Sequence, residues 1–300
     1  MKDVLIIGSD GKLGSGLMKK LETRAHGTSR RPHILTSEIY LDLLNQESIE
    51  KLEKVSYYKY AIIVAAISEP DQCYLDQKLS LTINVESTIK VLKILKKKSI
   101  KPIFISTEMV FDGNKGNYSE VDKPDPILIY GKQKLEVEKF IQNHFHDFMI
   151  LRLPKIYSSQ NNDRSILNSF YCDIVSNKEC VYAKDQYFSP TLQDDFELSV
   201  SKVIEKDLSG IFHLSSSCRV SRWDFFEMFA NKVGNFGRIK QGLLSDISFL
   251  ENRPNDLSLN GEKLSKALDL VFATPRAGID KWMNDNPAYL SNLVGHHEKF

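Results

Sequence analysis

A tyrosine and a lysine stand four residues apart in the segment IYGKQKLEVEKF, at Tyr130 and Lys134. Pro124 and Pro126 precede the segment, so we expect a helix to begin near Tyr130 and to place both side chains on one face. A free phenol has a pKa near ~10, and a neighbouring ammonium favours the phenolate and lowers that value. Such a pair can give a proton to a carbonyl oxygen as hydride reaches its carbon. The alternative is a solvated helix end with one stray tyrosine.

Hydroxyl groups follow a second apolar run, in FISTEMVFDG (104–113). Ser106, Thr107 and Glu108 stand at the C-terminal end of a predicted strand, and ligands bind at those ends in open α/β sheets. A hydroxyl there can hydrogen-bond the reacting oxygen and align it with the phenol. The structural alternative is that Ser106 and Thr107 only terminate the strand and cap the next segment. Together with the tyrosine and lysine, a strand-end hydroxyl favours catalysis.

A third motif, GSDGKLG, places Gly8, Gly11 and Gly14 in a GxxGxxG frame between a predicted strand and a predicted helix. A glycine-rich turn lets the backbone approach a pyrophosphate closely, and the helix N-terminus stabilises the negative charge. The GxxxxGK[ST] frame of a Walker loop is absent, and the turn favours a dinucleotide. Lys12 and Leu13, within the same turn, are predicted to lie against this cofactor. The alternative is a tight turn without a ligand.

Basic residues at the end of the second predicted strand, AHGTSRRP (25–32), bear on which dinucleotide binds. An NAD site usually offers a carboxylate to the ribose 2′-hydroxyl there, whereas a cationic group accommodates a 2′-phosphate. Ser29, Arg30 and Arg31 favour NADP, with NAD as the alternative, because arginine meets phosphate in a forked, charge-assisted geometry. The arginines could instead lie on a solvated loop. Asp42 either contacts the adenine or caps the helix beginning LLNQESIEKL.

These residues need a sheet to position them, and the first half of the chain has the pattern of one. Short apolar runs rich in β-branched residues alternate with segments of helical period, as in parallel strands joined by crossover helices. Leu13, Leu17 and Leu21 recur every fourth residue and predict a helix ending near Arg24. Continuous apolar strands imply helices on both faces. The predicted strands are 3–8, 25–32, 61–66, 101–107 and 148–154, with a long helix at 79–98.

After Pro154 the alternation weakens, and a polar stretch at 157–165 opens a second region. The segment GIFHLSS (210–216) has the pattern of a strand that returns to the sheet. The fold class is therefore α/β: a Rossmann-type doubly wound parallel sheet with a smaller, interleaved C-terminal substrate domain. We expect a cofactor domain at 1–155, to which about 181–216 return, and a substrate-binding region at about 156–180 and 217–300.

Composition limits the function classes. The chain has 300 residues, 42% of them hydrophobic, with 40 basic and 39 acidic residues. The balance offers no global field for nucleic acid or an anionic membrane surface, and neither is expected as a partner. The four cysteines are scattered, which is typical of a reducing compartment, and we expect a cytoplasmic protein. The seven histidines lack metal-ligand spacing, so no metal is expected. A homodimer is compatible with the sequence.

Several segments resemble one family in the same chain order: the extended short-chain dehydrogenase/reductases, and within them the dTDP-4-dehydrorhamnose reductase group. GSDGKLG is similar to the group's cofactor turn, STEMVFDG to its STDYVFDG, and YSEVDKPDPILIYGKQKLEVE to its YxExDxxxPxxxYGxxKxxxE. LRLPKIY, DQYFSPT, GIFHLSS and RPNDLSL resemble later segments. The likeness runs nearly end to end, which makes it far more specific than any single motif.

The resemblance implies a Rossmann domain for NAD(P) and a smaller, variable domain for a nucleotide-linked sugar. By position it implies that Thr107, Tyr130 and Lys134 are catalytic, and that Lys134 also holds the nicotinamide ribose. The other positions that it implies are Ala65 and Ala66 in the cofactor cleft, Asn84 on the central helix, Pro154 near the nicotinamide, and Glu108, Met109 and Arg253 at the substrate.

Two departures from the group's pattern border the substrate cleft. Glu108 and Met109 replace the group's Asp-Tyr, and AAISEPDQC (65–73) differs from its AAYTAVDKAE. They leave the hydride chemistry in place and leave the sugar open. The leading hypothesis is an NADPH-dependent reductase of a nucleotide-activated 4-keto-6-deoxy sugar, with Tyr130 as proton donor. The alternatives are an epimerase or dehydratase of the same family, with Glu108 as an additional acid/base group, and a non-catalytic, NADP-binding regulatory subunit.

Overall fold

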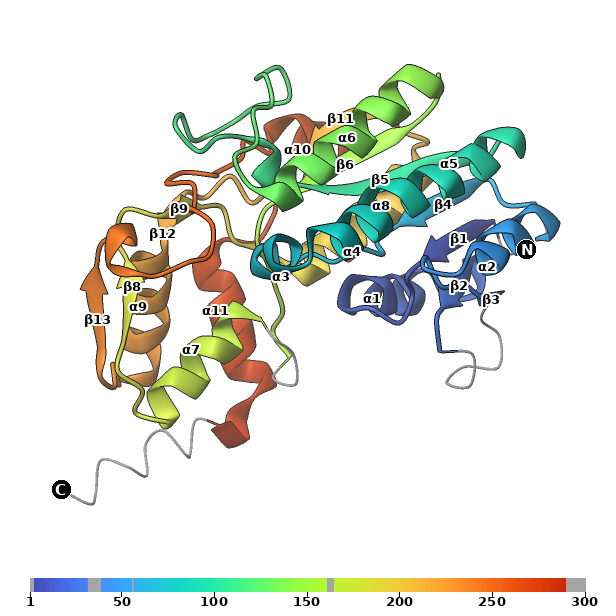
Figure 1. Ribbon diagram of the computed structural model, residues 1–300. Helices are drawn as coiled ribbons and strands as arrows, with labels where there is room; N and C mark the ends of the chain where they lie inside the picture. The colour runs from blue at the N-terminus through green and yellow to red at the C-terminus, as the bar shows by residue number, and fades with distance from the viewer. Residues whose placement is uncertain (1–2, 32–38, 56, 161–164, 290–300) are drawn as a thin grey trace.

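The protein is described by a computed structural model that covers residues 3–31, 39–55, 57–160 and 165–289 (Figure 1). Its centre is a seven-stranded sheet in the order β11-β6-β5-β4-β1-β2-β3, in which every neighbouring pair is parallel. The strands are β1 (Val4–Ile7), β2 (Ala25–Ser29), β3 (Ile39–Tyr40), β4 (Tyr60–Ile63), β5 (Lys101–Thr107), β6 (Met149–Leu153) and β11 (Gly210–His213). The α/β class and the doubly wound parallel sheet are confirmed.

Helices cover both faces of this sheet. On one face lie α1 (Lys12–Leu21), α8 (Gln193–Glu205) and α10 (Glu262–Leu268); on the other lie α2 (Gln46–Glu50), α5 (Thr88–Lys97) and α6 (Ile129–His144). Successive side chains of a strand point to opposite faces, and β1 shows it: Val4 and Ile6 enter one core, Leu5 and Ile7 the other. Both cores are apolar, which explains the continuous hydrophobic strands.

One predicted strand and one predicted helix differ from the structure in their bounds or their regularity. The strand predicted at 61–66 ends at Ile63, because the N–H groups of Val64 and Ala65 both donate to the carbonyl of Ile7, where the neighbouring strand also stops. The long helix predicted at 79–98 runs as α4 (Gln77–Leu81), a π-helical segment η3 (Thr82–Ser87) and then α5. Such π segments are rare and are frequently found at functional sites, and this one contains Asn84.

A smaller lobe is built on an aromatic core beside the sheet (Figure 1). Its helices are α7 (Ile166–Val175), α9 (Arg222–Val233) and α11 (Pro275–Asp285). Its two-stranded pairs are β8 (Cys180–Ala183) with β13 (Ile239–Gly242), β9 (Tyr187–Phe188) with β12 (Val220–Ser221), and β7 (Ile156–Tyr157) with β10 (Thr191–Leu192). Phe225 is buried in this core and Trp223 packs at its edge, which explains the aromatic pattern of SRWDFFEMF.

The chain passes between the lobes several times. Strand β8 pairs only within the smaller lobe, although the predicted returning segment begins at 181. Phe196 of α8, and Leu264 of α10, are buried in the core beneath the sheet. We therefore propose that the returning parts are 193–216 and 261–272, and that 156–160, 165–192, 217–260 and 273–289 form the smaller lobe.

The three glycines of the first turn differ in whether, and why, the fold requires a glycine at that position. Gly8 has φ +94°, a conformation that side chains rarely adopt, and a Cβ there would lie 2.9 Å from Ala65. At Gly14 a Cβ would lie 2.1 Å from the carbonyl oxygen of Gly8, so only glycine lets α1 pack against the turn. At Gly11 a Cβ would meet only the same oxygen, at 3.5 Å, which is ordinary contact. The fold itself therefore does not require Gly11.

We predict that Gly14→Ala lowers the free energy of unfolding by about 1 to 3 kcal/mol, the usual cost of forcing extra atoms into a packed site. Part of this cost is offset by the better helix propensity of alanine. Gly11→Ala is the matched control, since its φ of −78° suits alanine, and it should unfold with the wild-type midpoint in urea. Equal stability of the two variants would contradict this account of the turn.

Candidate active site

Three cavities join along the C-terminal edge of the sheet and the gap between the lobes. The edge cavity (about 480 Å³) lies over the ends of β1, β2 and β4 and is lined by Gly8, Arg30 and Asp42 among others. The central cavity (about 420 Å³) lies over β5 and β6 and contains Tyr130. The lobe cavity (about 390 Å³) reaches into the smaller lobe. Glu69 lines all three, so they adjoin one another, and together we call them the groove.

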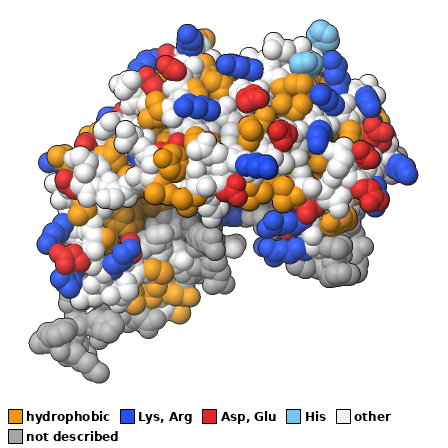
Figure 2. All heavy atoms as spheres, viewed as in Figure 1, with side chains coloured by type: hydrophobic (Ala, Val, Ile, Leu, Met, Phe, Trp, Pro, Cys, Tyr) orange, Lys and Arg blue, Asp and Glu red, His pale blue; other side chains and the backbone are white. Residues whose placement is uncertain are grey.

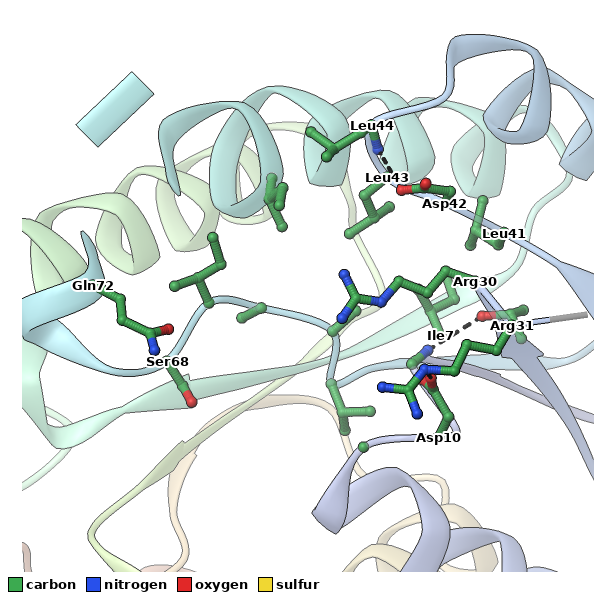
Figure 3. A pocket seen from close by; sticks show the side chains of 18 of the residues that line it. Ile7, Asp10, Arg30, Arg31, Leu41, Asp42, Leu43, Leu44, Ser68 and Gln72 are labelled. Carbon is green, nitrogen blue, oxygen red and sulfur yellow. Dashed lines mark hydrogen bonds and ion pairs between the residues drawn. The ribbon is translucent and has the colours of Figure 1, made fainter. Parts of the chain in front are cut away.

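The edge cavity has a cationic rim (Figure 3). Arg30 projects across the cavity and Arg31 lies beside Asp10, with 4.0 Å between Arg31 Nε and Asp10 Oδ2. Ser29 is buried and does not line this cavity; its hydroxyl accepts a hydrogen bond from the backbone N–H of Arg31 (3.0 Å). Ser29 therefore shapes the turn that presents the arginines. Two guanidinium groups at this position suit an anionic ligand.

Asp42 lies on the opposite wall of the edge cavity, between Leu41 and Leu43 (Figure 3). Its carboxylate accepts a hydrogen bond from the N–H of Leu44 (2.9 Å), while the cap of α2 is Asn45, which accepts from the N–H of Ser48. The alternative that Asp42 caps this helix is therefore wrong. The apolar neighbours and the carboxylate together fit a flat, polar-edged ring such as a nucleobase.

The central cavity brings together most of the residues that the sequence singles out. Its walls combine the glycine turn with the ends of β5 and β6 and the start of α6. The predicted residues that line it are Gly8, Gly11, Lys12, Leu13, Gly14, Ala66, Thr107, Glu108, Met109, Tyr130, Lys134 and Pro154. Ala65 lines the edge cavity instead. The side chains of Thr107, Tyr130 and Lys134 thus face one space together with the turn expected to hold a cofactor.

A close backbone contact sets the position of Thr107 relative to Tyr130. Thr107 Oγ1 accepts a hydrogen bond from the N–H of Met109 (3.2 Å) and so caps the 3₁₀ turn η4 (Glu108–Val110). Thr107 therefore caps the turn and also lines the cavity. The first turn of α6 packs on η4 at Gly131, where a Cβ would lie 1.9 Å from the carbonyl oxygen of Met109. Gly131 is a positioning residue that sequence reasoning missed, although it stands inside the YGxxK motif.

The pKa values of the tyrosine and the lysine are both perturbed. Tyr130 is buried, and burial raises its pKa, with the nearby Cys73 and Glu69 acting in the same direction. The expectation that the ammonium lowers the phenol pKa is therefore wrong for this arrangement. Burial lowers the pKa of Lys134 to about 7, against the opposing effect of Glu138. At neutral pH the phenol stays protonated and the lysine is close to half charged.

The loop that forms the floor of the groove is fixed by Asn84. The backbone N–H of Ile67 donates to Asn84 Oδ1 (2.8 Å), and Asn84 Nδ2 donates to the carbonyl of Ile67 (2.9 Å) and to Gln133 Oε1 (2.8 Å). Gln133 lies on α6, between Tyr130 and Lys134. Asn84 lines none of the three cavities, so it positions the loop and the helix.

The lobe cavity combines cations with aromatic side chains. Of the residues predicted to contact substrate, Glu108, Met109 and Arg253 line it; Lys155 and Arg222 line it too and were not predicted. Its aromatic residues are Tyr182, Tyr187, Phe188 and Phe249. Lys155 directly follows Pro154 at the end of β6, which is a signal that sequence reasoning could have used. Arg222 opens α9, a helix that the sequence marks only as core.

Glu108 is the most deeply buried acid of the site, with 2% of its surface exposed. Burial raises its pKa to about 8, although Arg222 and Lys155 oppose the shift. Its Oε2 atom is buried and has no hydrogen-bond partner among the described residues. At neutral pH this carboxyl is therefore mostly protonated, and it contributes little negative charge to the cavity.

The face of the molecule seen in Figure 2 is mixed in charge. Lys and Arg side chains are interspersed there with Asp, Glu and apolar side chains, without a continuous basic stripe. The described residues contain no cluster of three or more His, Cys, Asp or Glu side chains that could hold a metal ion. Across the same part of the chain, no helix combines the length and apolarity needed to cross a bilayer.

Comparisons with known proteins agree with this geometry. The family model described as the RmlD substrate binding domain matches residues 1–287. The dTDP-4-dehydrorhamnose reductase of Aggregatibacter actinomycetemcomitans is 26% identical over 289 residues (90% of this chain, 94% of the relative). Methionine adenosyltransferase 2 subunit beta of Danio rerio is 26% identical over 235 residues (74% of this chain, 71% of the relative).

Among solved structures, dTDP-4-dehydrorhamnose reductase from Bacillus anthracis str. Ames, in complex with NADP, superposes with a TM-score of 0.84 at 22% identity. The match covers 95% of this chain and 100% of that one, and it shows a shared fold. The family model, which spans nearly the whole chain, carries the assignment. The chain therefore belongs to the RmlD-like extended short-chain dehydrogenase/reductases.

Proposed function

We propose that this protein is an NADPH-dependent reductase of a nucleotide-activated 4-keto-6-deoxy sugar. One observation carries the proposal: Thr107, Tyr130 and Lys134 line a single cavity with the glycine turn, and that cavity adjoins the lobe cavity, with which it shares lining residues. A cofactor along the turn and a sugar nucleotide between the lobes would therefore meet at the phenol. The reductase names of several relatives support the same reaction class.

The residues of the central cavity divide the work of carbonyl reduction. Bound NADPH would supply the hydride. Tyr130 gives the proton to the carbonyl oxygen, and its raised pKa keeps the hydroxyl protonated until transfer. Thr107 hydrogen-bonds the same oxygen and aligns it. The charged form of Lys134 stabilises the phenolate that remains and offers a proton to restore it.

The edge cavity supports NADP over NAD. Arg30 and Arg31 stand where a 2′-phosphate would lie, and a related structure was determined with NADP. NAD remains the alternative, since Asp42 lines the same cavity and could accept from a ribose hydroxyl. All four cysteines are free thiols, which supports the proposed cytoplasmic setting. A homodimer stays part of the proposal.

Two other functions have an observation in their favour. Similarity to methionine adenosyltransferase 2 subunit beta favours a regulatory subunit that binds NADP without turnover. The buried Glu108 beside the central cavity favours an epimerase or dehydratase, because these reactions need an additional acid/base group. Co-purification of tightly bound NAD would support the epimerase or dehydratase.

The decisive experiment is NADPH oxidation with a panel of dTDP-, UDP-, GDP- and CDP-linked 4-keto sugars. We expect turnover with at least one member, and a loss of about 10²–10⁴-fold in kcat for Tyr130→Phe, the usual contribution of a general acid. NADPH binding should persist in this variant, because the ring remains. If the protein binds NADPH but oxidises it with no member of the panel, the regulatory subunit is favoured. Full activity of Tyr130→Phe would refute the mechanism.

The arginine pair predicts the cofactor preference. Arg30→Ala should raise the KM for NADPH by about tenfold or more, the effect of losing a charge-assisted hydrogen bond, and should leave the KM for NADH nearly unchanged. Steady-state kinetics with both cofactors measures the ratio of the KM for NADPH to the KM for NADH. Lys19→Ala, on the exposed last turn of α1, is a matched loss of one charge. An equal effect of Arg30→Ala on both cofactors would argue against a 2′-phosphate contact.

The pKa of Lys134, lowered to about 7, predicts the pH dependence of kcat/KM for reduction, a quantity that reports the free enzyme. The ammonium is present below this pKa and is lost above it, so kcat/KM should fall as the pH rises from about 7. The variant Glu108→Gln should show the same fall in kcat/KM above pH 7, because the carboxyl that it removes has its pKa nearer 8. A profile that is flat between pH 6 and 8.5 (roughly 1.5 units above the lysine pKa) would contradict the role of Lys134.

A further inference from the structure

Three cations line the lobe cavity, and one of them has its charge compensated. Arg253 Nη2 lies 2.6 Å from Asp71 Oδ1, and the guanidinium stacks on Phe249 with 4.8 Å to the ring centroid. Asp71 lies on α3 (Pro70–Leu75), within the segment AAISEPDQC. Arg253 keeps one donor, Nη1, without a partner among the described residues. It can therefore still donate a hydrogen bond, but it contributes little net positive charge.

The charges of Lys155 and Arg222, unlike that of Arg253, are not compensated by an ion pair within the described part of the chain. Both are half-buried, and neither charged group forms an ion pair or a hydrogen bond with any residue that the structure describes. They are close enough to interact: burial lowers the pKa of Lys155, and the charge of Arg222 lowers it further. The guanidinium of Arg222 is held over the ring of Phe188, 4.0 Å from its centroid. Two like charges held together without an ion-pair partner favour an anion between them.

The acidic neighbours do not remove this excess. Glu108 is the acid that acts on both cations, and with its pKa raised to about 8 it is mostly neutral at pH 7. Glu69 faces Lys155 from the floor of the groove, and Lys12 adds a further positive charge from the glycine turn. The inner end of the lobe cavity is therefore net positive. Lys155 also lines the central cavity, so this charge lies beside the proposed reaction centre.

We propose that Lys155 and Arg222, rather than Arg253, hold the diphosphate of a nucleoside-diphosphate-linked substrate. The inference rests on the proposed function, and it names the residues that recognise the substrate. The aromatic residues of the same cavity offer faces for the base, and the central cavity receives the sugar. In this arrangement the ion pair of Arg253 and Asp71 joins the 253–257 segment to α3 and closes one side of the cavity.

The test is calorimetric titration of the full-length protein, with saturating NADPH, against UDP and dTDP, with uridine and thymidine as phosphate-free controls. Lys155→Met and Arg222→Met should each weaken diphosphate binding by about tenfold or more and leave nucleoside binding unchanged. Arg222→Met should also leave NADPH binding unchanged, because Arg222 does not line the central cavity. Arg222→Lys should recover part of the affinity. Lys240→Met, on the exposed strand β13 of the same lobe, is the matched control and should bind as wild type.

The variant Asp71→Asn should change the diphosphate affinity in the opposite direction. It removes the charge that compensates Arg253, so diphosphate affinity should rise, by about twofold to tenfold for one surface-accessible charge. The proposal is overturned if Arg253→Gln abolishes diphosphate binding while Lys155→Met does not. It is also overturned if the wild-type protein binds none of UDP, dTDP, GDP and CDP. Urea midpoints for every variant separate misfolding from lost contacts. Diphosphate binding that depends on Lys155 without any turnover would refute the proposed function and leave this inference standing.

Discussion

The contact between the first turn of α6 and the turn η4 sets the geometry of the whole groove. At Gly131 the helix approaches the carbonyl of Met109 so closely that no side chain fits between them. This contact fixes Tyr130 relative to Thr107, and Glu108 and Met109 project from the same turn toward the lobe cavity. One backbone approach thus places the proton donor, the orienting hydroxyl and part of the substrate wall.

A second constraint keeps the loop after β4 in register with that helix. Asn84 binds both backbone groups of Ile67 and the side chain of Gln133, and it does so from a π-helical segment. Such π segments are rare and are frequently found at functional sites. Glu69, two residues after Ile67, lines all three cavities. The floor of the groove therefore depends on one buried amide.

Much of the fold and of the central cavity could be predicted from the sequence. Parallel strands carry continuous apolar runs, and glycine turns and the YxxxK spacing are local in sequence, so β1, β5, β6 and the central residues could be predicted directly. The π segment could not be predicted, because the local sequence pattern is that of one continuous helix and the contacts of Asn84 are tertiary. The pKa of Tyr130 was mispredicted because spacing along a helix says nothing of burial, and burial is the main cause of the raised pKa.

Residues of the lobe cavity were harder to predict, because they come from segments distant in sequence. Arg222 opens a helix of the smaller lobe, Lys155 follows β6, and Arg253 pairs with an aspartate 182 residues before it. Their charges meet only after the lobes assemble. Sequence pattern can mark such residues as polar, and it cannot show which cation is already compensated. Ion pairing in the folded chain decides that.

The repeated passage of the chain between the two lobes has an evolutionary consequence. Segments around α7, α9 and α11 build the aromatic core of the smaller lobe, while α8 and α10, which lie between them in sequence, pack beneath the sheet. No single contiguous piece carries the substrate wall, so recombination cannot exchange it as a cassette without cutting through both cores. Divergence in such a chain proceeds most readily by substitutions at individual lining positions, and Glu108 and Met109 are positions of this kind.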